Sequence, residues 1–315
     1  MAEIGKDIQY AKRLLEAGEL VAIPTETVYG LAGNALNTNA ALEIFEVKDR
    51  PHFDPLIVHV ANLNSAEHYV EEIPEQARLL ADEFWPGPLT LLLKKKRIVP
   101  DIITSGLDTV GIRCPNHILT HALLDQLTFP LAAPSANPFG YVSPTTPEHV
   151  NEQLGGKIKY ILDGGACQVG VESTILGFED NTPVIYRMGG LSIEAIEDVI
   201  GKVTVQLHST SNPKAPGQLK SHYAPRKKVV LGKMEDLLQE YPAHVSGLLT
   251  FKQNFNSPFQ FVLSPTGNIE EAAQNLFLAL REFDKMPIDI ILAEFVPEKG
   301  LGRAINDRLR RAAAL

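Results

Sequence analysis

The chain has 315 residues, of which 44% are hydrophobic and 21% are charged, and its formal net charge is −9. These proportions are ordinary for a soluble globular protein, and at roughly 150 residues per domain the length allows two domains. The acidic balance argues against nucleic-acid binding through bulk charge as the main activity, although it leaves room for a local basic patch.

The two cysteines, Cys114 and Cys167, belong to no CxxC motif or Cys/His cluster, which excludes a zinc ribbon and a disulfide framework. The N-terminal segment carries charges at nearly every turn and lacks the apolar core of a signal peptide. No run approaches the ~20 apolar residues that span a bilayer. We therefore expect a cytoplasmic protein with no membrane segment.

Apolar periodicity predicts the elements of the first part of the chain. Ile4, Ile8, Ala11 and Leu15 recur at helical spacing, with Gly18 as the stop. Further helices are predicted from Thr38 to just before Pro51, from Pro74 through 84, and after the N-cap Ser192. Strands are predicted near 20–23, 56–60, 89–95, 109–115, 131–137, 159–165, 173–178 and 184–190.

Because strands outnumber helices, we expect a twisted mixed sheet with packed helices over residues 1–204. Residues 205–226 are rich in proline and basic residues and predict a linker. Residues 227–315 alternate strands and helices, which predicts a smaller Rossmann-like α/β domain. That domain lacks GxGxxG, so its fold implies no cofactor.

The chain has no GxSxG, Walker A, HExxH or kinase signature, but polar residues gather in five short segments. The first, "PTETVYG" at 24–30, is either an exposed turn or part of a site. The second contains Lys48 and Arg50. If this stretch is extended, the two cations share a face and suit an anion; otherwise they form a solvated helix end, where cations favour the helix dipole.

The other three segments are strand ends and loops. Arg113 lies inside an apolar strand and needs a partner, either a structural ion pair or a ligand. The loop with Ser135, Asn137 and Ser143 can hydrogen-bond a phosphate or a base, or it is an ordinary proline-rich loop. "GVESTI" with Arg187 is an anion site or a surface cross-strand pair. Together the segments favour phosphate handling by positioning and charge neutralisation over covalent catalysis.

Seven blocks in order, "PTETVYGL", "KDRP…PLIVHV", "FWPGPLTLLL", "TVGIRCP", "APSAN…SPT", "GVESTI" and "RMGG", resemble the YrdC-like domain. Lys48, Arg50, Ser135 and Asn137 match its Lys-x-Arg and Ser-x-Asn signature. "PGQLKSHYAP" and "GLGRAINDRLRRAA" resemble the linker and the C-terminal end of the long form of the threonylcarbamoyl-AMP synthase family.

The resemblance implies an enzyme that joins L-threonine, bicarbonate and ATP into threonylcarbamoyl-AMP, releases pyrophosphate, and passes its product to a tRNA threonylcarbamoyl-transfer system. It implies threonine contacts through Thr27, His59, Arg113, the backbone around Ala133, and Ser173. It implies ATP contacts through Arg50, Asp54, Thr109, Ser135, Asn137, Ser143, Arg187 and Tyr223, with His222 beside Tyr223. Lys48 and Arg50 would serve catalysis, with Lys48 near the bicarbonate and the α-phosphate.

The family often has Asn at the position of Asp54. If the Asp54 side chain contacted the nucleotide, its carboxylate would repel the phosphates, whereas a contact through its backbone would not depend on the side-chain charge. The sequence shows no acidic cage, so no protein metal site is expected and Mg²⁺ would be held by the nucleotide. The linker 205–226 is the expected lid over the site. Alternatives are an RNA-binding module, or a carbamoyl-handling protein of the same fold. Tight tRNA binding is not expected.

Overall fold

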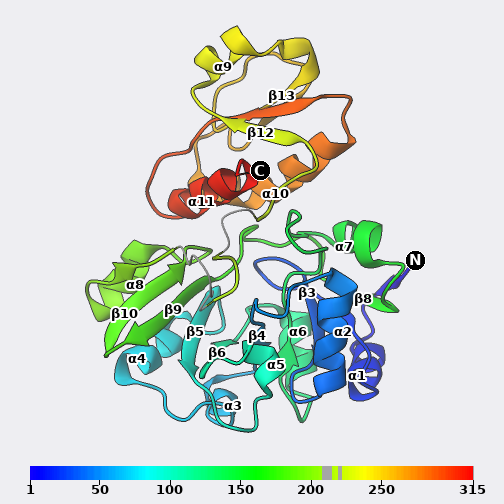
Figure 1. Ribbon diagram of the computed structural model, residues 1–315, viewed down its shortest axis with the longest axis vertical. Helices are drawn as coiled ribbons and strands as arrows, with labels where there is room; N and C mark the ends of the chain where they lie inside the picture. The colour runs from blue at the N-terminus through cyan, green and yellow to red at the C-terminus, as the bar shows by residue number, and fades with distance from the viewer. Residues whose placement is uncertain (208–214, 219–221, 315) are drawn as a thin grey trace.

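The chain forms two α/β parts that are stacked along the long axis of the molecule (Figure 1). The computed structural model describes residues 1–207, 215–218 and 222–314. An 11-stranded mixed sheet with packed helices makes up the first part, and a 4-stranded parallel sheet with its helices makes up the second. The predicted fold class is therefore confirmed.

The large sheet has the strand order β1-β8-β2-β3-β7-β4-β6-β5-β9-β10-β11 and mixes parallel with antiparallel pairs. Its strands are β1 (Glu3–Gly5), β2 (Val21–Ile23), β3 (Gly30–Asn34), β4 (Ile57–His59), β5 (Leu89–Lys94), β6 (Thr109–Arg113), β7 (Leu131–Ala132), β8 (Tyr160–Leu162), β9 (Thr174–Glu179), β10 (Thr182–Arg187) and β11 (Thr204–Val205). Its helices are α1 (Ile8–Glu16), α2 (Thr38–Lys48), α3 (Leu63–Ala66), α4 (Glu75–Phe84), α5 (Asp101–Thr104), α6 (Ile118–Leu124), α7 (Pro147–Leu154) and α8 (Ile193–Ile200).

The small sheet has the order β12-β15-β13-β14. Its elements are β12 (Lys228–Leu231), α9 (Met234–Glu240), the 3₁₀ turn η1 (Ala243–Val245), β13 (Ser246–Thr250), β14 (Gln260–Val262), α10 (Ile269–Lys285), β15 (Ile290–Ala293) and α11 (Gly302–Ala312). Residues 208–214 and 219–221 of the predicted linker lie outside the described residues. The proposed boundaries at 204 and 227 stay predictions.

The first helix is shorter than predicted. Ile4 does not belong to it but lies in β1, where it pairs in parallel with Ile161 of β8. The helix begins only at Ile8, because the side chain of Asp7 caps it by accepting a hydrogen bond from the backbone N–H of Tyr10 at 3.0 Å. Gly18 follows the helix with φ +84°, which confirms it as the stop.

The other helices of the first part that were predicted from periodicity lie where the sequence places them. α2 begins at Thr38 behind the N-cap Asn37, and α4 follows Pro74 directly. The predicted cap Ser192 accepts a hydrogen bond from the backbone N–H of Ala195 at 3.2 Å and begins α8. The predicted strands are also present, although β7 is reduced to two residues.

The two parts share a hydrophobic core at their junction. In Figure 1, α10 and α11 lie on the side of the second part that faces the first. Val28, Val142 and Val171 of the first part belong to the same buried apolar cluster as Leu276 and Phe277 of α10. Burial of this apolar surface holds the second part against loops that follow and precede the strands of the large sheet.

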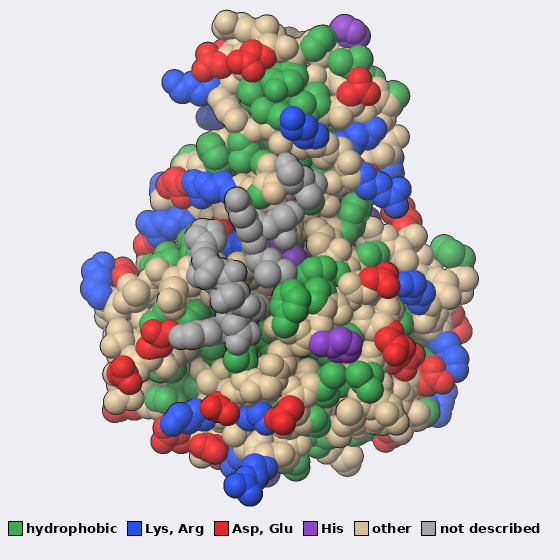
Figure 2. Space-filling view, viewed as in Figure 1, with side chains coloured by type: hydrophobic (Ala, Val, Ile, Leu, Met, Phe, Trp, Pro, Cys, Tyr) green, Lys and Arg blue, Asp and Glu red, His purple; other side chains and the backbone are tan. Residues whose placement is uncertain are grey.

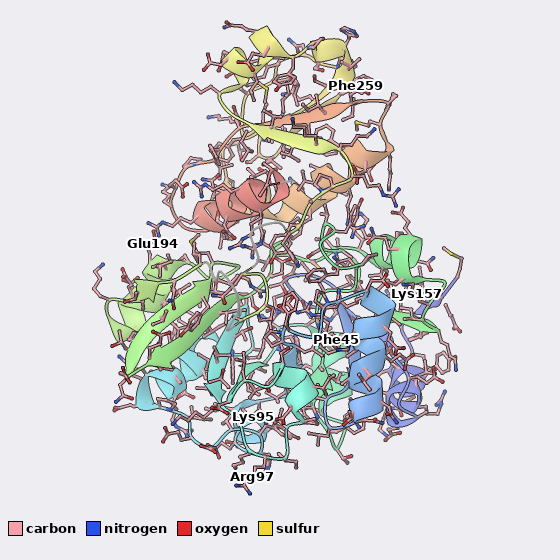
Figure 3. All side chains as sticks on the ribbon, viewed as in Figure 1. Phe45, Lys95, Arg97, Lys157, Glu194 and Phe259 are labelled. Atoms are coloured by element: carbon pink, nitrogen blue, oxygen red, sulfur yellow. The ribbon has the colours of Figure 1, made fainter. Side chains whose placement is uncertain are left out.

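An ion pair closes the edge of the same junction. Glu194 Oε1 of α8, labelled in Figure 3, lies 2.8 Å from Arg303 NH1 of α11. Both side chains are partly exposed, so the pair contributes little beyond fixing the relative position of the two helices.

Candidate active site

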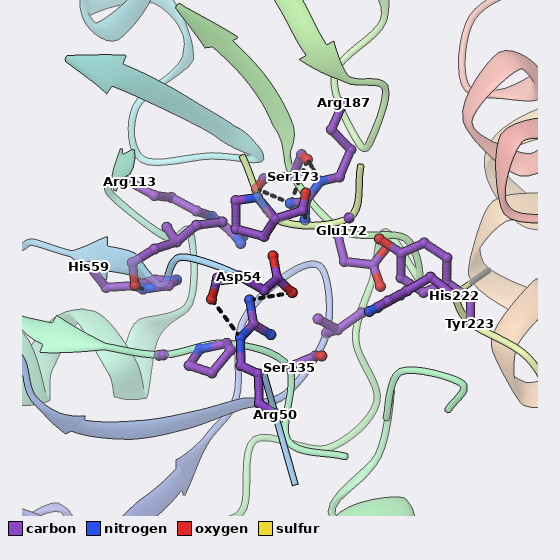
Figure 4. A pocket seen from close by; sticks show the side chains of 16 residues that line it. Arg50, Asp54, His59, Arg113, Ser135, Glu172, Ser173, Arg187, His222 and Tyr223 are labelled. Atoms are coloured by element: carbon purple, nitrogen blue, oxygen red, sulfur yellow. Dashed lines mark hydrogen bonds and ion pairs between the residues drawn. The ribbon is translucent and has the colours of Figure 1, made fainter. Parts of the chain in front are cut away.

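A cavity opens where the ends of several strands of the large sheet meet the described part of the linker (Figure 4). Sixteen residues line it: Val28, Arg50, Asp54, Ile57, His59, Arg113, Ala133, Pro134, Ser135, Glu172, Ser173, Arg187, Pro216, Gly217, His222 and Tyr223. Three arginines from separate segments of the chain thus face one space. Many of the predicted site residues are among those brought together here.

The segment with Lys48 and Arg50 is a helix end rather than an extended stretch, but it is buried rather than solvated. The helix-end interpretation was therefore right for the backbone and wrong for the surroundings, and anion binding by the two cations stays a prediction. Lys48 is the last residue of α2, and Asp49 turns the chain with φ +53° in the left-handed region. Lys48 and Arg50 are only 1% and 7% exposed. The turn at Asp49, rather than strand alternation, sends both cations inward.

Lys48 lies behind the cavity wall rather than in it. Its ammonium donates to the backbone carbonyl of Ser135 and, at 2.5 Å, to that of Asn137. Burial, together with the charge of Arg50, lowers the pKa of Lys48 well below its ordinary value. The predicted Lys-x-Arg and Ser-x-Asn segments are therefore physically joined, with Lys48 fixing the loop that presents Ser135.

Arg50 and Asp54 form a buried ion pair inside the cavity. Arg50 NH2 lies 2.9 Å from Asp54 Oδ2, and Arg50 also donates to the backbone carbonyls of Asp54 and Pro55 at 3.0 and 2.8 Å. Neither carboxylate oxygen of Asp54 meets the criteria for a hydrogen bond with any of the described residues. Burial raises the pKa of Asp54, although the charges of Arg50 and Lys48 oppose this.

Arg113 at the end of β6 forms the ion pair that was one of its two predicted alternatives. Its NH2 group lies 2.8 Å from Glu26 Oε1 and donates to Thr27 Oγ1 at 2.8 Å. Its Nε has no hydrogen-bond partner within the part of the chain that the structure describes. Arg113 also lines the cavity. Its guanidinium therefore combines an ion pair to Glu26 through NH2 with an Nε donor that remains available to a ligand.

His59 lies beside Arg113 because β4 and β6 pair in register at these two residues. Burial and the charge of Arg113 lower the pKa of His59 to about 3. The imidazole is therefore neutral near pH 7 and is available for hydrogen bonding without adding charge.

Arg187 ends β10 and binds the segment that carries Ser173. Its Nε and NH2 groups donate to the backbone carbonyl of Ser173 at 3.0 and 2.9 Å, and NH2 also donates to Ser173 Oγ at 3.0 Å. Glycine is required at 189, because a Cβ there would lie 2.2 Å from the carbonyl oxygen of Glu172. This close approach brings the end of β10 against the Ser173 segment.

Part of the linker closes one side of the cavity. Pro216, Gly217, His222 and Tyr223 line it, and Figure 4 shows His222 and Tyr223 together at one edge. The free volume inside is about 50 Å³. Pockets for small ligands are typically about 300–1,000 Å³, so a nucleotide and an amino acid enter only if a wall moves.

Five predicted residues do not line this cavity. Thr27, Lys48, Asn137 and Ser143 lie directly behind it and bond to lining residues or to the loop of Ser135. Thr109 lies at the other end of β6 from Arg113, beside a separate hollow near Lys94 and Asn181. Its assignment to the nucleotide stays a prediction that the cavity geometry does not support.

Two acids in the site were not assigned from the sequence. Glu26 pairs with Arg113, and Glu172 lines the cavity while accepting from Ser143 Oγ and from Arg308 Nε. Both occur in the quoted segments "PTETVYG" and "GVESTI". Their partners Arg113 and Arg308 lie far away in the sequence, so no local pattern could have paired them.

The described residues contain no group of three or more His, Cys, Asp or Glu side chains that could hold a metal ion. Within the same residues, no helix is long and apolar enough to cross a membrane.

Two family models match consecutive parts of the chain. A model described as "Telomere recombination" matches residues 13–189, and one described as "Threonylcarbamoyl-AMP synthase, C-terminal domain" matches residues 191–314. The first covers strands β2 to β10 of the large sheet, and the second covers α8, β11, the linker residues that line the cavity, and the small sheet with its helices.

Similar proteins agree with these matches. A threonylcarbamoyl-AMP synthase of Pyrococcus abyssi is 44% identical over 97% of this chain and 94% of its own length, and one of Bacillus subtilis is 42% identical over 97% and 92%. The solved structure of P. abyssi Sua5 complexed with L-threonine matches with a TM-score of 0.93 at 42% identity, covering 99% of this chain and 97% of that one. The chain therefore belongs to the threonylcarbamoyl-AMP synthase family, in its two-domain form.

Proposed function

We propose that this protein makes threonylcarbamoyl-AMP and pyrophosphate from L-threonine, bicarbonate and ATP, for the threonylcarbamoyladenosine modification of tRNA. The observation that carries the proposal is the cavity in which Arg50, Arg113 and Arg187 converge from separate segments beside hydroxyls and a neutral histidine. Guanidinium groups bind carboxylate and phosphate bidentately, and this site contains enough of them for both substrates.

Threonine is assigned to the side of the cavity formed by β4 and β6. Arg113 would take the carboxylate of the amino acid with donors that include its unpartnered Nε. His59, Ser173 and the backbone around Ala133 line the same space. Thr27 supports this side through its hydrogen bond to Arg113. The threonine complex of the P. abyssi relative supports an amino-acid site in this family.

ATP is assigned to the side formed by Arg50, Ser135, Arg187 and Tyr223. Asn137 and Ser143 support it from behind the wall, through the backbone of the Ser135 loop and through Glu172. Asp54 holds Arg50 by charge rather than facing the phosphates as a free acid. Pairing with Arg50 explains how Asp54 can be an acid at this position, where a direct contact between its carboxylate and a phosphate would be unfavourable.

The chemistry follows in two steps. The threonine amine attacks the carbon of bicarbonate, a C–N bond forms, and loss of water leaves N-carboxythreonine. A carboxylate oxygen of that intermediate then attacks the α-phosphate, an O–P bond forms, and the bond to pyrophosphate breaks. Arg50 and Arg187 offset the charge that builds on the phosphates, which is electrostatic stabilisation rather than covalent catalysis.

Lys48 contributes to this chemistry from behind the wall. In the closed cavity its ammonium is held on two backbone carbonyls. We propose that it reaches the bicarbonate and the α-phosphate only when the Ser135 loop shifts, and that it otherwise keeps that loop in place. The small free volume and the linker residues in the wall support a lid that opens to admit substrates and then excludes water.

Mg²⁺ is proposed to be held mainly by the nucleotide, because the two carboxylates that line the cavity, Asp54 and Glu172, already face arginines. We propose a cytoplasmic enzyme whose product passes to a tRNA threonylcarbamoyl-transfer system. Tight tRNA binding is not proposed, since the net charge is −9 and Figure 2 shows basic and acidic side chains intermingled on the visible face.

The test is pyrophosphate release by the purified protein supplied with ATP, L-threonine and bicarbonate. Release that requires both threonine and bicarbonate supports the synthase, and no release with any amino acid overturns it. Release with carbamoyl phosphate in place of threonine and bicarbonate would favour the carbamoyl-handling alternative. Salt-sensitive tRNA binding without any release would favour the RNA-binding alternative.

A further inference from the structure

Arg308 of α11 is a fully buried arginine of the second part that reaches the edge of the cavity. Its Nε donates to Glu172 Oε2 at 2.8 Å, and its NH1 and NH2 groups donate to Asp307 Oδ2 at 2.8 Å and the backbone carbonyl of Met188 at 3.0 Å. The guanidinium carbon also lies 4.7 Å from the ring centroid of Tyr223. Each of the three guanidinium nitrogens therefore donates a hydrogen bond.

Glu172 connects Arg308 to the cavity, because it lines the cavity and accepts the hydrogen bond from Arg308. Figure 4 shows its carboxylate among the lining side chains, on the side of His222 and Tyr223. An unpaired carboxylate there would repel a triphosphate or draw Arg187 away from it. Burial favours a higher pKa for Glu172, but the charges of Arg308 and Arg187 outweigh it and hold the pKa below its ordinary value.

The hydrogen bonds show how the charge is divided. Arg308 donates to Glu172, whereas Arg187 donates to the backbone and hydroxyl oxygens of Ser173. Arg187 thus keeps its charge for the cavity. If Arg308 were neutral, Glu172 would be left with Arg187 as the nearest compensating cation.

A second arginine of the same part holds the neighbouring wall. Arg281 of α10 donates to the backbone carbonyls of Val142 and, at 3.2 Å, Ser143, and Ser143 Oγ in turn donates to Glu172. Packing is tight here, since a Cβ on Gly170 would lie 2.4 Å from the Cα of Gln274. The helices α10 and α11 therefore fix both the Ser143 loop and the Glu172 segment.

We propose that Arg308 is a positioning residue for the nucleotide side of the site: it neutralises Glu172 so that Arg187 remains available to phosphate. The inference rests on the proposed function, because it assigns phosphate to this side of the cavity. It gives the C-terminal part of the chain a specific task, which is to set ATP affinity rather than threonine affinity.

The test is steady-state pyrophosphate release with Arg308→Gln, Glu172→Gln and the double variant. Arg308→Gln is expected to raise the KM for ATP about 10- to 100-fold, the effect of losing a charged hydrogen bond, with little change in the KM for threonine. Glu172→Gln is expected to lower the KM for ATP, because it removes negative charge. The double variant is expected to return close to the value of Glu172→Gln.

A pH series adds a readout that a purely structural role would not move. In Arg308→Gln the pKa of Glu172 loses its main lowering influence and rises, so the KM for ATP should fall as the pH is lowered. Wild-type protein should lack this acid-side recovery. Since Arg308→Gln leaves a buried carboxylate unpaired and can fail to fold, the double variant and Glu172→Gln alone keep the test decisive.

The matched control is Arg310→Gln on the same helix, where Arg310 pairs with Glu298 at 2.6 Å and both side chains are exposed. It should leave both KM values unchanged. A double variant as impaired as Arg308→Gln, a KM for ATP raised by Glu172→Gln, or an equal rise in both KM values would overturn the inference. Failure of wild-type protein to release pyrophosphate would instead overturn the proposed function.

Discussion

The cavity and the domain junction both bury arginines, but they satisfy them differently. Arg308 at the junction has a partner on every nitrogen group, and its pKa is raised. In the cavity, Arg113 has an Nε without a partner among the described residues, and burial lowers the pKa of Arg50 and Arg187. Carboxylates of Glu172 and Asp307 offset the charge of Arg308, whereas the hydrogen bonds of Arg187 go to backbone and hydroxyl oxygens. An arginine whose hydrogen-bond partners are neutral keeps its charge for an anion, and one paired with carboxylates holds the structure together.

The largest expected effect comes from removing a cavity arginine, which tests whether its charge serves catalysis. Arg187→Ala should lower the rate of pyrophosphate release about 10²- to 10³-fold, the loss expected when one group that stabilises transition-state charge is removed. Arg187→Lys keeps the positive charge but loses the bidentate guanidinium. Its rate of pyrophosphate release should therefore lie between those of wild type and Arg187→Ala. A loss under tenfold in Arg187→Ala would mean that Arg187 serves Ser173 alone.

The next prediction separates the two substrate sides. Arg113→Ala should raise the KM for threonine about 10- to 100-fold and leave the KM for ATP within a few-fold, because a charge-assisted hydrogen bond to the carboxylate is lost. The measurement is initial rate against each substrate in turn. Thr27→Val is the matched control: it removes the 2.8 Å hydrogen bond to Arg113 but keeps the Glu26 pair, and should have a smaller effect of the same kind. Equal rises in both KM values would contradict the assignment.

Sequence reasoning found the cavity arginines for a physical reason. An arginine inside an apolar strand, such as Arg113, needs a partner, and this requirement is visible without coordinates. The partners were harder to predict. Glu26 lay in a segment that was noted only as polar, and Arg308 is separated from Glu172 by 136 residues. Pairings over such distances leave no local pattern in a single sequence.

Local backbone geometry explains the remaining errors. At Lys48 the helix ends and Asp49 turns the chain with φ +53°, so spacing along the sequence misjudged where the side chains point. At the N-terminus, Ile4 happens to continue the spacing of α1, yet the cap at Asp7 excludes it. The strands were predicted more reliably, because apolar runs bounded by turn residues are a strong signal.

His59 offers a test of how the cavity charges act on a neighbour. Its pKa is about 3 when folded, against about 6.5 in an unfolded chain, so the unfolded state binds a proton below pH 6.5 while the folded state does not. Stability is therefore lost as the pH falls from 6.5 towards 3. Between about pH 7 and 5 this amounts to about 2 kcal/mol.

Urea unfolding of wild type and His59→Gln at both pH values measures this difference. The variant should lose about 2 kcal/mol less on acidification, whereas the exposed His244→Gln should behave as wild type. If His59→Gln is as acid-sensitive as wild type, His59 is not the group responsible. His222, whose pKa burial lowers well below its ordinary value, would be the next candidate, followed by His149.

The smallest expected effect belongs to a surface arginine, which is neither buried at the junction nor part of the cavity. Arg78 pairs with Glu67 at 3.0 Å, but the two side chains are 47% and 48% exposed. Arg78→Ala should therefore change the free energy of unfolding by less than about 1 kcal/mol and leave pyrophosphate release unchanged, because water competes for both charges. The measurement is urea unfolding at low and high salt, where any effect should shrink as salt rises. A larger loss would mean that burial is the wrong criterion for ranking the arginines of this protein.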